Sequence, residues 1–147
     1  MFRYPCGIPD SRNEYLYITG RIEQGRGNKD EVGNKVAKFG PNGFIEFLPS
    51  LKTGRTNHVC AGYYNSQDNF VLLVAGGRDN IRGGPTTNVK YSILKILFMF
   101  FTAFTASTEI FEVGVSSQWR EVSPLPQGLV QAKAVTLNNK VYLTGNI

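Results

Sequence analysis

The chain has only two cysteines and one histidine, and this scarcity narrows the chemistry that it can perform. Cys6 and Cys60 are too few for a disulfide framework, or for a zinc site with four nitrogen or sulfur ligands in a recognisable spacing. His58 is the only histidine base for a triad, and one histidine is too few for a copper oxidase. The sequence therefore predicts no catalytic residues, no metal site and no cofactor. Cys60 lies in an apolar strand pattern, so we expect a buried structural thiol that packs near His58.

Clusters of like charge are also missing. The formal net charge is +5, from 16 Lys and Arg against 11 Asp and Glu, but no more than two basic residues stand in a row. A nucleic-acid-binding protein gathers its cations on one element, so we do not expect nucleic acid to be the partner. The first ten residues, MFRYPCGIPD, lack the apolar core of a signal peptide. Together with the two cysteines, this favours a cytoplasmic location.

The sequence does contain an internal repeat, in which one pattern of residue types occurs nearly twice. Residues 44–77 and 119–146 each pass from an aromatic residue through a glutamate, a proline and a glycine turn to two apolar strands that end at glycine. Residues 14–21 repeat only the last part. Repetition at this scale is typical of folds in which each repeat forms one small structural unit. Strands bounded by turn residues are expected at 14–19, 35–39, 44–48, 58–64, 70–75, 107–113, 119–122, 130–137 and 140–144.

Two strand ends carry a more specific likeness. VLLVAGG at 71–77 and VYLTGN at 141–146 both run from an apolar strand into glycine, and each follows an aromatic residue and a Leu-Pro element. Together these features resemble the kelch repeat family. The resemblance implies a β-propeller of four-stranded antiparallel blades. The structural repeat positions would be Gly20, Gly76, Gly77, Gly145, Phe44 and Trp119. We expect the two aromatic residues, Phe44 and Trp119, to pack in the core between blades.

The expected fold class is therefore all-β, an incomplete kelch-type β-propeller. We expect the end of a preceding blade at 1–20, a loop at 21–34, a blade at 35–80 and a second blade at 107–147. A blade buries its apolar faces against its neighbours, so this arrangement leaves two faces open. Either the remaining blades of a larger propeller or self-association would cover them, and we favour a fragment of a larger propeller.

Residues 81–106 interrupt the repeat, and their second part is apolar and uncharged. A transmembrane helix needs about 20 apolar residues, whereas Lys95 and Glu109 bound this stretch. A membrane-attached protein that uses 93–106 is therefore an alternative that we do not favour. A folded, possibly helical insertion on a blade face is the second alternative. The third, which we prefer, is an intervening sequence translated in frame, because its removal restores the spacing of the repeat.

The expected function is non-catalytic protein–protein binding. The resemblance implies partners such as substrates of cullin-type ubiquitin ligases, or actin. Arg55 is the most notable loop residue, and its alternative role is to pack its own loop through hydrogen bonds to backbone carbonyls. The candidate partner-binding loop comprises Lys52, Thr53, Arg55, Asn57 and Arg78.

An enzyme on the propeller scaffold, of the oxidase or sialidase type, is the alternative function. Its active site would lie in blades outside this sequence. Glu46 and Glu121 occupy matching places in the two repeats, and a pair of carboxylates is the signature of a glycosidase. Matching places on successive blades lie one blade apart, so we interpret both glutamates as structural repeat positions.

Overall fold

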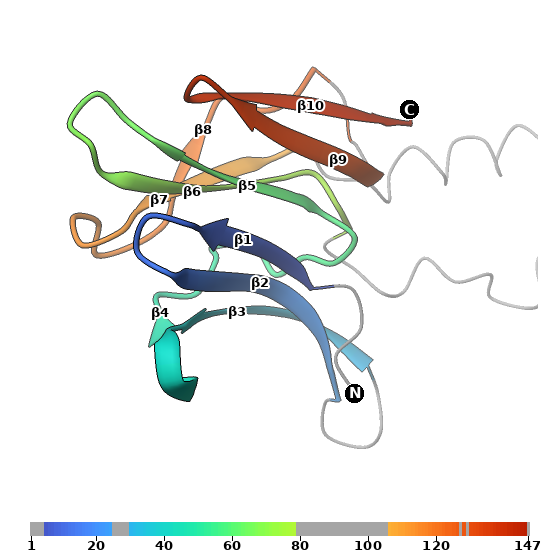
Figure 1. Ribbon diagram of the computed structural model, residues 1–147. Helices are drawn as coiled ribbons and strands as arrows, with labels where there is room; N and C mark the ends of the chain where they lie inside the picture. The colour runs from blue at the N-terminus through green and yellow to red at the C-terminus, as the bar shows by residue number, and fades with distance from the viewer. Residues whose placement is uncertain (1–4, 25–29, 79–105, 127, 129, 147) are drawn as a thin grey trace, which may run out of the picture.

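A computed structural model of the chain describes residues 5–24, 30–78, 106–126, 128 and 130–146. These residues form ten strands in three antiparallel sheets, with one short 3-10 helix, η1 (Pro41–Gly43), as their only helical element (Figure 1). The predicted all-β class is confirmed. Sheet 1 has the order β1 (Cys6–Asp10), β2 (Tyr15–Gln24), β3 (Asp30–Phe39), β4 (Ile45–Leu48). Sheet 2 has the order β5 (Val59–Tyr64), β6 (Phe70–Ala75), β7 (Thr108–Glu112), β8 (Arg120–Val122), and sheet 3 pairs β9 (Val130–Leu137) with β10 (Lys140–Asn146).

Sheet 2 lies between the other two sheets (Figure 1). The first strands of the three sheets are neighbours, since β1 contacts β5 and β5 contacts β9. Sheet 2 is therefore covered on both faces. This position explains why β6 reads as a continuous apolar run, FVLLVA, and not as an alternation of apolar and polar residues. The strand predicted at 70–75 is confirmed with these bounds.

The main core fills the space between sheets 1 and 2. Tyr17 of β2 packs on Phe70 of β6, with ring centroids 5.7 Å apart. The sheets meet so closely at Gly62 that an added Cβ would lie 2.7 Å from Ile8. Burial of each large apolar side chain contributes about 1.5–3 kcal/mol to stability. The buried cluster comprises Ile8, Tyr17, Val36, Leu51, Cys60, Phe70, Leu72, Val74, Phe111 and Trp119.

A disulfide bond joins sheet 1 to sheet 2. It links Cys6 of β1 to Cys60 of β5, whose Cα atoms are 6.0 Å apart. The prediction of a free thiol at Cys60 is therefore wrong, although the residue is buried as expected. Composition could not reveal the bond, because the two cysteines are 54 residues apart and only the packing of β1 on β5 brings them together. Disulfides persist in oxidising compartments, so this bond argues against the predicted cytoplasmic location.

The sheets divide the chain at different points from those predicted. The predicted blade at 35–80 combines the last two strands of sheet 1 with the first two strands of sheet 2. The predicted blade at 107–147 likewise combines the end of sheet 2 with sheet 3. The loop predicted at 21–34 is wrong for most of its length, because β2 extends to Gln24 and β3 begins at Asp30.

Gly20, which was expected to end a strand, lies inside β2. The register of β2 against β3 shifts between Thr19 and Arg21, so Gly20 forms a bulge, and its φ of +59° suits glycine. Gly145 occupies the same kind of register shift in β10. The strand β1, within the segment 1–20, was missed because its sequence, CGIPD, contains glycine and proline, which are depleted in strands.

The two aromatic repeat positions behave differently. Trp119 is buried and stacks on Phe111 with ring centroids 5.4 Å apart, so its predicted core role is confirmed. Phe44 is 56% exposed, so the same prediction is wrong there. Ile45 lies opposite Phe39 in sheet 1, and this is the place that Trp119 takes beside Phe111 in sheet 2. The structural match of Trp119 is therefore Ile45 and not Phe44. Ile45 is 53% exposed as well, because no other sheet of the described residues covers its face of sheet 1.

The segment 81–106 lies outside the described residues, apart from Ala106. The strands on either side of it are paired, with Ala75 of β6 opposite Thr108 of β7. Gly76 also donates its N–H to the Ser107 carbonyl at 3.1 Å. The chain therefore leaves sheet 2 after β6 and returns to it at β7, at the same end of the sheet. In the part of the chain that the structure describes, no helix has the length and apolar character to cross a membrane.

Candidate functional site

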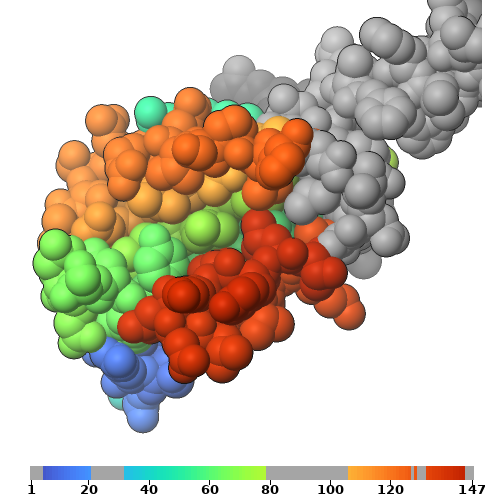
Figure 2. All heavy atoms as spheres, turned by 90° about the horizontal axis from the view of Figure 1, so that it is seen from above, coloured from blue at the N-terminus to red at the C-terminus, as the bar shows by residue number. Residues whose placement is uncertain are grey.

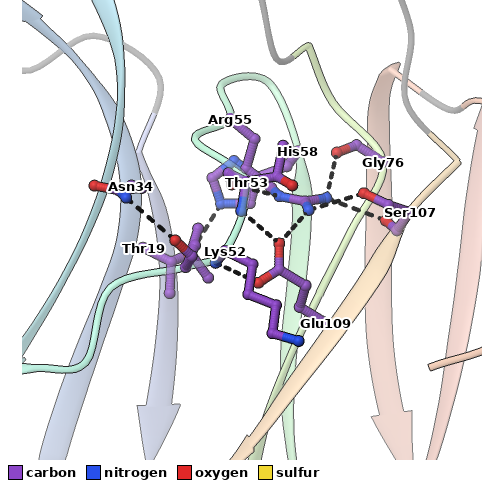
Figure 3. Close-up of polar contacts among 10 residues, drawn as sticks. Thr19, Asn34, Lys52, Thr53, Arg55, His58, Gly76, Ser107 and Glu109 are labelled. Atoms are coloured by element: carbon purple, nitrogen blue, oxygen red, sulfur yellow. Dashed lines mark hydrogen bonds and ion pairs between the residues drawn. The ribbon is translucent and has the colours of Figure 1, made fainter. Parts of the chain in front are cut away.

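The candidate site is the loop of residues 49–58, which connects β4 to β5 and runs between sheets 1 and 2 (Figure 3). Thr56 and Arg78 hold the loop beside the end of β6 by exchanging two backbone hydrogen bonds of 3.0 and 2.8 Å. The structure therefore brings the predicted partner-binding residues to one end of the sheets. These are Lys52, Thr53, Arg55 and Asn57 in the 49–58 loop, and Arg78 beside it.

Arg55 lies inside the loop and has no exposed surface. Its Nη2 is 2.5 Å from Oε1 of Glu109 and 2.9 Å from Oγ of Ser107. Its Nη1 donates to the carbonyls of Gly76 at 3.0 Å and Ser107 at 3.1 Å (Figure 3). The prediction that Arg55 contacts a partner is therefore wrong. The guanidinium instead joins the loop to both strands beside it through backbone carbonyls and one carboxylate.

Glu109 is the other half of this buried pair, and it too is fully buried. Besides Arg55, its carboxylate accepts the backbone N–H groups of Lys52 at 2.7 Å and Thr53 at 3.2 Å. A buried charge is tolerated only where it is paired and hydrogen-bonded in this way. On the other side of the loop, Leu51 donates its N–H to the Asn34 carbonyl at 2.8 Å. The main chain of the loop is thus bonded to both sheets.

His58 ends the loop in a tightly enclosed position. Its Nε2 is 2.8 Å from Oγ1 of Thr19, its ring lies against Gly20, and its Cα and Cβ lie against Gly77. A Cβ on Gly77 would lie 2.8 Å from the His58 Cβ, so the expected structural role of this glycine is explained by close approach. Removal from water, reinforced by the positive charge of Arg55, lowers the pKa of His58 to about 3, although an interaction with the Thr19 backbone opposes this. The imidazole is neutral at pH 7 and serves packing.

The other four predicted residues are not fully buried. The side chain of Lys52 is exposed, whereas Thr53, Asn57 and Arg78 are half-buried. Asn57 has a φ of +53°, in the left-handed region that asparagine tolerates better than most residues. The result is a small polar surface with two cationic side chains on a fixed main chain.

Sequence reasoning missed a second polar cluster at the opposite end of the sheets. Asp10 is buried, and its carboxylate accepts from the Tyr64 hydroxyl at 2.5 Å and from Nδ2 of Asn13 at 2.8 Å. The Arg12 guanidinium lies 3.8 Å above the Tyr64 ring and pairs with Asp68 at 2.7 Å. Loss of hydration and the bond to Asp10 raise the pKa of Tyr64 to about 12. The cluster ties the β1–β2 turn to the β5–β6 turn, and no local signal in the sequence connects the two.

The remaining chemical candidates do not assemble into a reactive site. Cys60 is oxidised, so it offers no thiolate to His58. Glu46 forms an ion pair with Lys38 in sheet 1, whereas Glu121 lies opposite Glu109 in sheet 2. Within the described ranges, no group of three or more His, Cys, Asp or Glu side chains is placed to hold a metal ion.

Comparison with known proteins shows a similarity of fold but no family. No protein-family model matches the sequence, and no curated protein matches it. Among solved structures 78 chains match, one of them described as the structure of YjhT. That chain is 20% identical in sequence, with a TM-score of 0.61, and the match covers 88% of this chain and 41% of that one. The chain therefore spans about two fifths of the structure it resembles, and the likeness concerns the fold alone.

Proposed function

We propose that this chain is a non-catalytic protein–protein interaction module built from kelch-type repeats in an incomplete β-propeller. Two of its sheets have four antiparallel strands whose spatial order follows the chain, and the first strands of all three sheets are neighbours. Radial repetition of four-stranded sheets is the plan of a propeller. The chain also matches the fold of part of a larger solved structure, over 41% of that structure.

The observation that carries the binding proposal is the construction of the 49–58 loop. Its exposed residue Lys52 projects from a main chain that Glu109 holds by two backbone hydrogen bonds. Binding residues occur disproportionately on loops that a rigid scaffold positions. A pre-ordered loop also loses little conformational entropy when a partner binds.

The charge of the site suggests the chemistry of the partner. Lys52 is cationic and exposed, so an acidic surface on the partner protein would complement it. The kelch resemblance adds two partner classes, namely substrates of cullin-type ubiquitin ligases and actin filaments. Complementary surface charges are screened by salt, so binding should weaken as ionic strength rises.

The proposal is tested by binding measurements on a matched pair of variants. Proteins captured by the wild-type chain are purified and titrated, with actin filaments as a defined first probe in co-sedimentation. Lys52→Glu should weaken binding at least tenfold. Gln67→Ala should bind as the wild type does, because Gln67 is exposed in the β5–β6 turn, at the opposite end of sheet 2. Equal binding by Lys52→Glu, or no specific protein partner at all, would overturn the proposal.

A further inference from the structure

Two sheet faces of the molecule carry unburied apolar side chains, and they lie at its opposite ends (Figure 1). One is the face of sheet 1 that points away from sheet 2, and the other is the face of sheet 3 that points away from sheet 2. Figure 2 looks toward sheet 3, and there the β9–β10 hairpin faces the viewer. Among the described residues, every exposed large apolar side chain except Val115 lies on or beside one of these faces. They are Leu16, Phe44, Ile45 and Phe47 at sheet 1, and Val135, Leu137 and Tyr142 at sheet 3.

The open face of sheet 1 repeats a surface that is buried inside the molecule. Leu16 lies four residues before Gly20 and opposite Phe39, as Leu72 lies four residues before Gly76 and opposite Phe111. Leu16 is 41% exposed, whereas Leu72 is fully buried beneath sheet 1. Ile45 likewise takes the place of the buried Trp119. The open face forms an apolar groove of about 470 Å³, lined in part by Ile18, Phe39, Ile45 and Phe47.

The open face of sheet 3 repeats the surface that covers sheet 2. Tyr142 lies three residues before Gly145 and opposite Val135, as Tyr17 lies three residues before Gly20 and opposite Ile8. Tyr17 and Ile8 are each 1% exposed, because they pack on sheet 2. Tyr142 and Val135 are 55% and 60% exposed. The chain therefore displays both halves of its own sheet 1–sheet 2 interface, one at each end.

We infer that this chain self-associates head to tail, with the open face of sheet 3 in one copy packed on the open face of sheet 1 in the next. Tyr142 and Val135 would cover Leu16 and the groove beside it, as Tyr17 and Ile8 cover Leu72 within one chain. A contact between two different faces is heterologous, so it builds a ring or a filament. This inference rests on the fold and does not depend on the proposed binding function.

The charged side chains on the two open faces predict how salt affects the contact. Lys35 lines the groove of sheet 1, and Lys133 and Lys140 are exposed on the open face of sheet 3. These like charges oppose association at low ionic strength, and salt screens them. Self-association should therefore strengthen with added salt, whereas an acidic partner on either face would bind more weakly.

Sedimentation velocity on the full chain tests the inference. The wild type should form species heavier than 16.3 kDa that grow with concentration and with salt. Ile45→Glu and Tyr142→Glu should each abolish association alone, because each removes one of the two faces. Mixed together, they should form a 1:1 complex through the two intact faces. Val115→Glu is the matched control, since Val115 is 62% exposed in the β7–β8 turn, and it should associate as the wild type does.

Three outcomes would overturn the inference. They are a wild type that stays monomeric at all concentrations, a single-face variant that still associates alone, and a mixture that does not restore the complex. If circular dichroism shows that Ile45→Glu fails to fold, Phe47→Glu takes its place, because Phe47 is 71% exposed on the same face.

Discussion

Arg55 and Glu109 form an ion pair in which neither side chain has any exposed surface, with Nη2 and Oε1 2.5 Å apart. Glu109 belongs to β7, whereas Arg55 belongs to the loop that precedes β5. The pair therefore fixes the 49–58 loop to sheet 2. Its stability depends on mutual pairing, because each charge would otherwise be buried without compensation.

Glu109→Ala should lower the free energy of unfolding by about 3–5 kcal/mol, since it leaves a buried guanidinium and two backbone N–H groups without their acceptor. Urea denaturation measures the change. Glu121→Ala is the control, because Glu121 lies opposite Glu109 on β8 but is exposed, and it should change stability by about 0.5 kcal/mol or less. A loss below about 1 kcal/mol in Glu109→Ala would contradict the role of the pair.

The disulfide between Cys6 and Cys60 should stabilise the chain by restricting its unfolded state. Replacement of both cysteines by serine should lower the free energy of unfolding by about 2–4 kcal/mol. Thiol titration of the denatured, unreduced protein should find no free thiol. Two reactive thiols per chain would show that the bond does not form, and the double variant would then match the wild type in stability.

His58 should make stability depend on pH. Its pKa is about 3 in the folded chain, against an ordinary value of 6.5. Between these pH values the unfolded chain binds a proton that the folded chain does not. The contribution of His58 to the free energy of unfolding is therefore fully present above pH 6.5 and is lost as the pH falls toward 3. The contribution approaches about 1.4 kcal/mol per pH unit well inside that window.

The measurement is the free energy of unfolding between pH 5 and pH 7, in the wild type and in His58→Asn. The variant should show a flatter pH dependence, even if it is less stable throughout. Parallel curves for the two proteins would mean that His58 titrates normally in the folded chain.

Gly20 should tolerate no side chain. Its φ is +59°, and an added Cβ would collide with the Arg55 carbonyl oxygen and lie 2.6 Å from Cε1 of His58. Gly114 has a φ of +76° but no atom within 4 Å of such a Cβ, so it isolates the cost of backbone strain. Thermal or urea unfolding should show a loss of about 1 kcal/mol for Gly114→Ala and a clearly larger loss for Gly20→Ala. Equal losses of stability in the two variants would show that the collision at Gly20 adds nothing to the cost of backbone strain.

Deletion of residues 81–106 should leave sheet 2 intact, because Ala75 and Thr108 are paired on either side of the segment. A shorter connection costs less entropy to close, so the deletion should stabilise the chain by about 1–2 kcal/mol. Circular dichroism and urea unfolding of the joined chain provide the measurement. Loss of the β-sheet spectrum would show that the segment is needed for folding.

The sequence alone was enough to predict the all-β class and most of the strands. Strand patterns are local, since alternation and turn residues act over a few positions, and the runs at 70–75, 130–137 and 140–144 were recognisable without any partner. The glycines of the repeat were recognisable for the same reason, since Gly20, Gly76 and Gly77 have a positive φ that excludes most other residues, although Gly20 lies at a bulge inside β2 and not at a strand end.

The tertiary structure alone decided which residues meet across the sheets. Nothing local indicates that Cys6 reaches Cys60, or that Arg55 is buried against Glu109. Both pairs join segments more than fifty residues apart. Ile45 takes the place of the buried Trp119 but is exposed, because no other sheet of the described residues covers its face of sheet 1. Contacts of this kind depend on how sheets pack, and packing is a property of the whole chain rather than of any short segment in it.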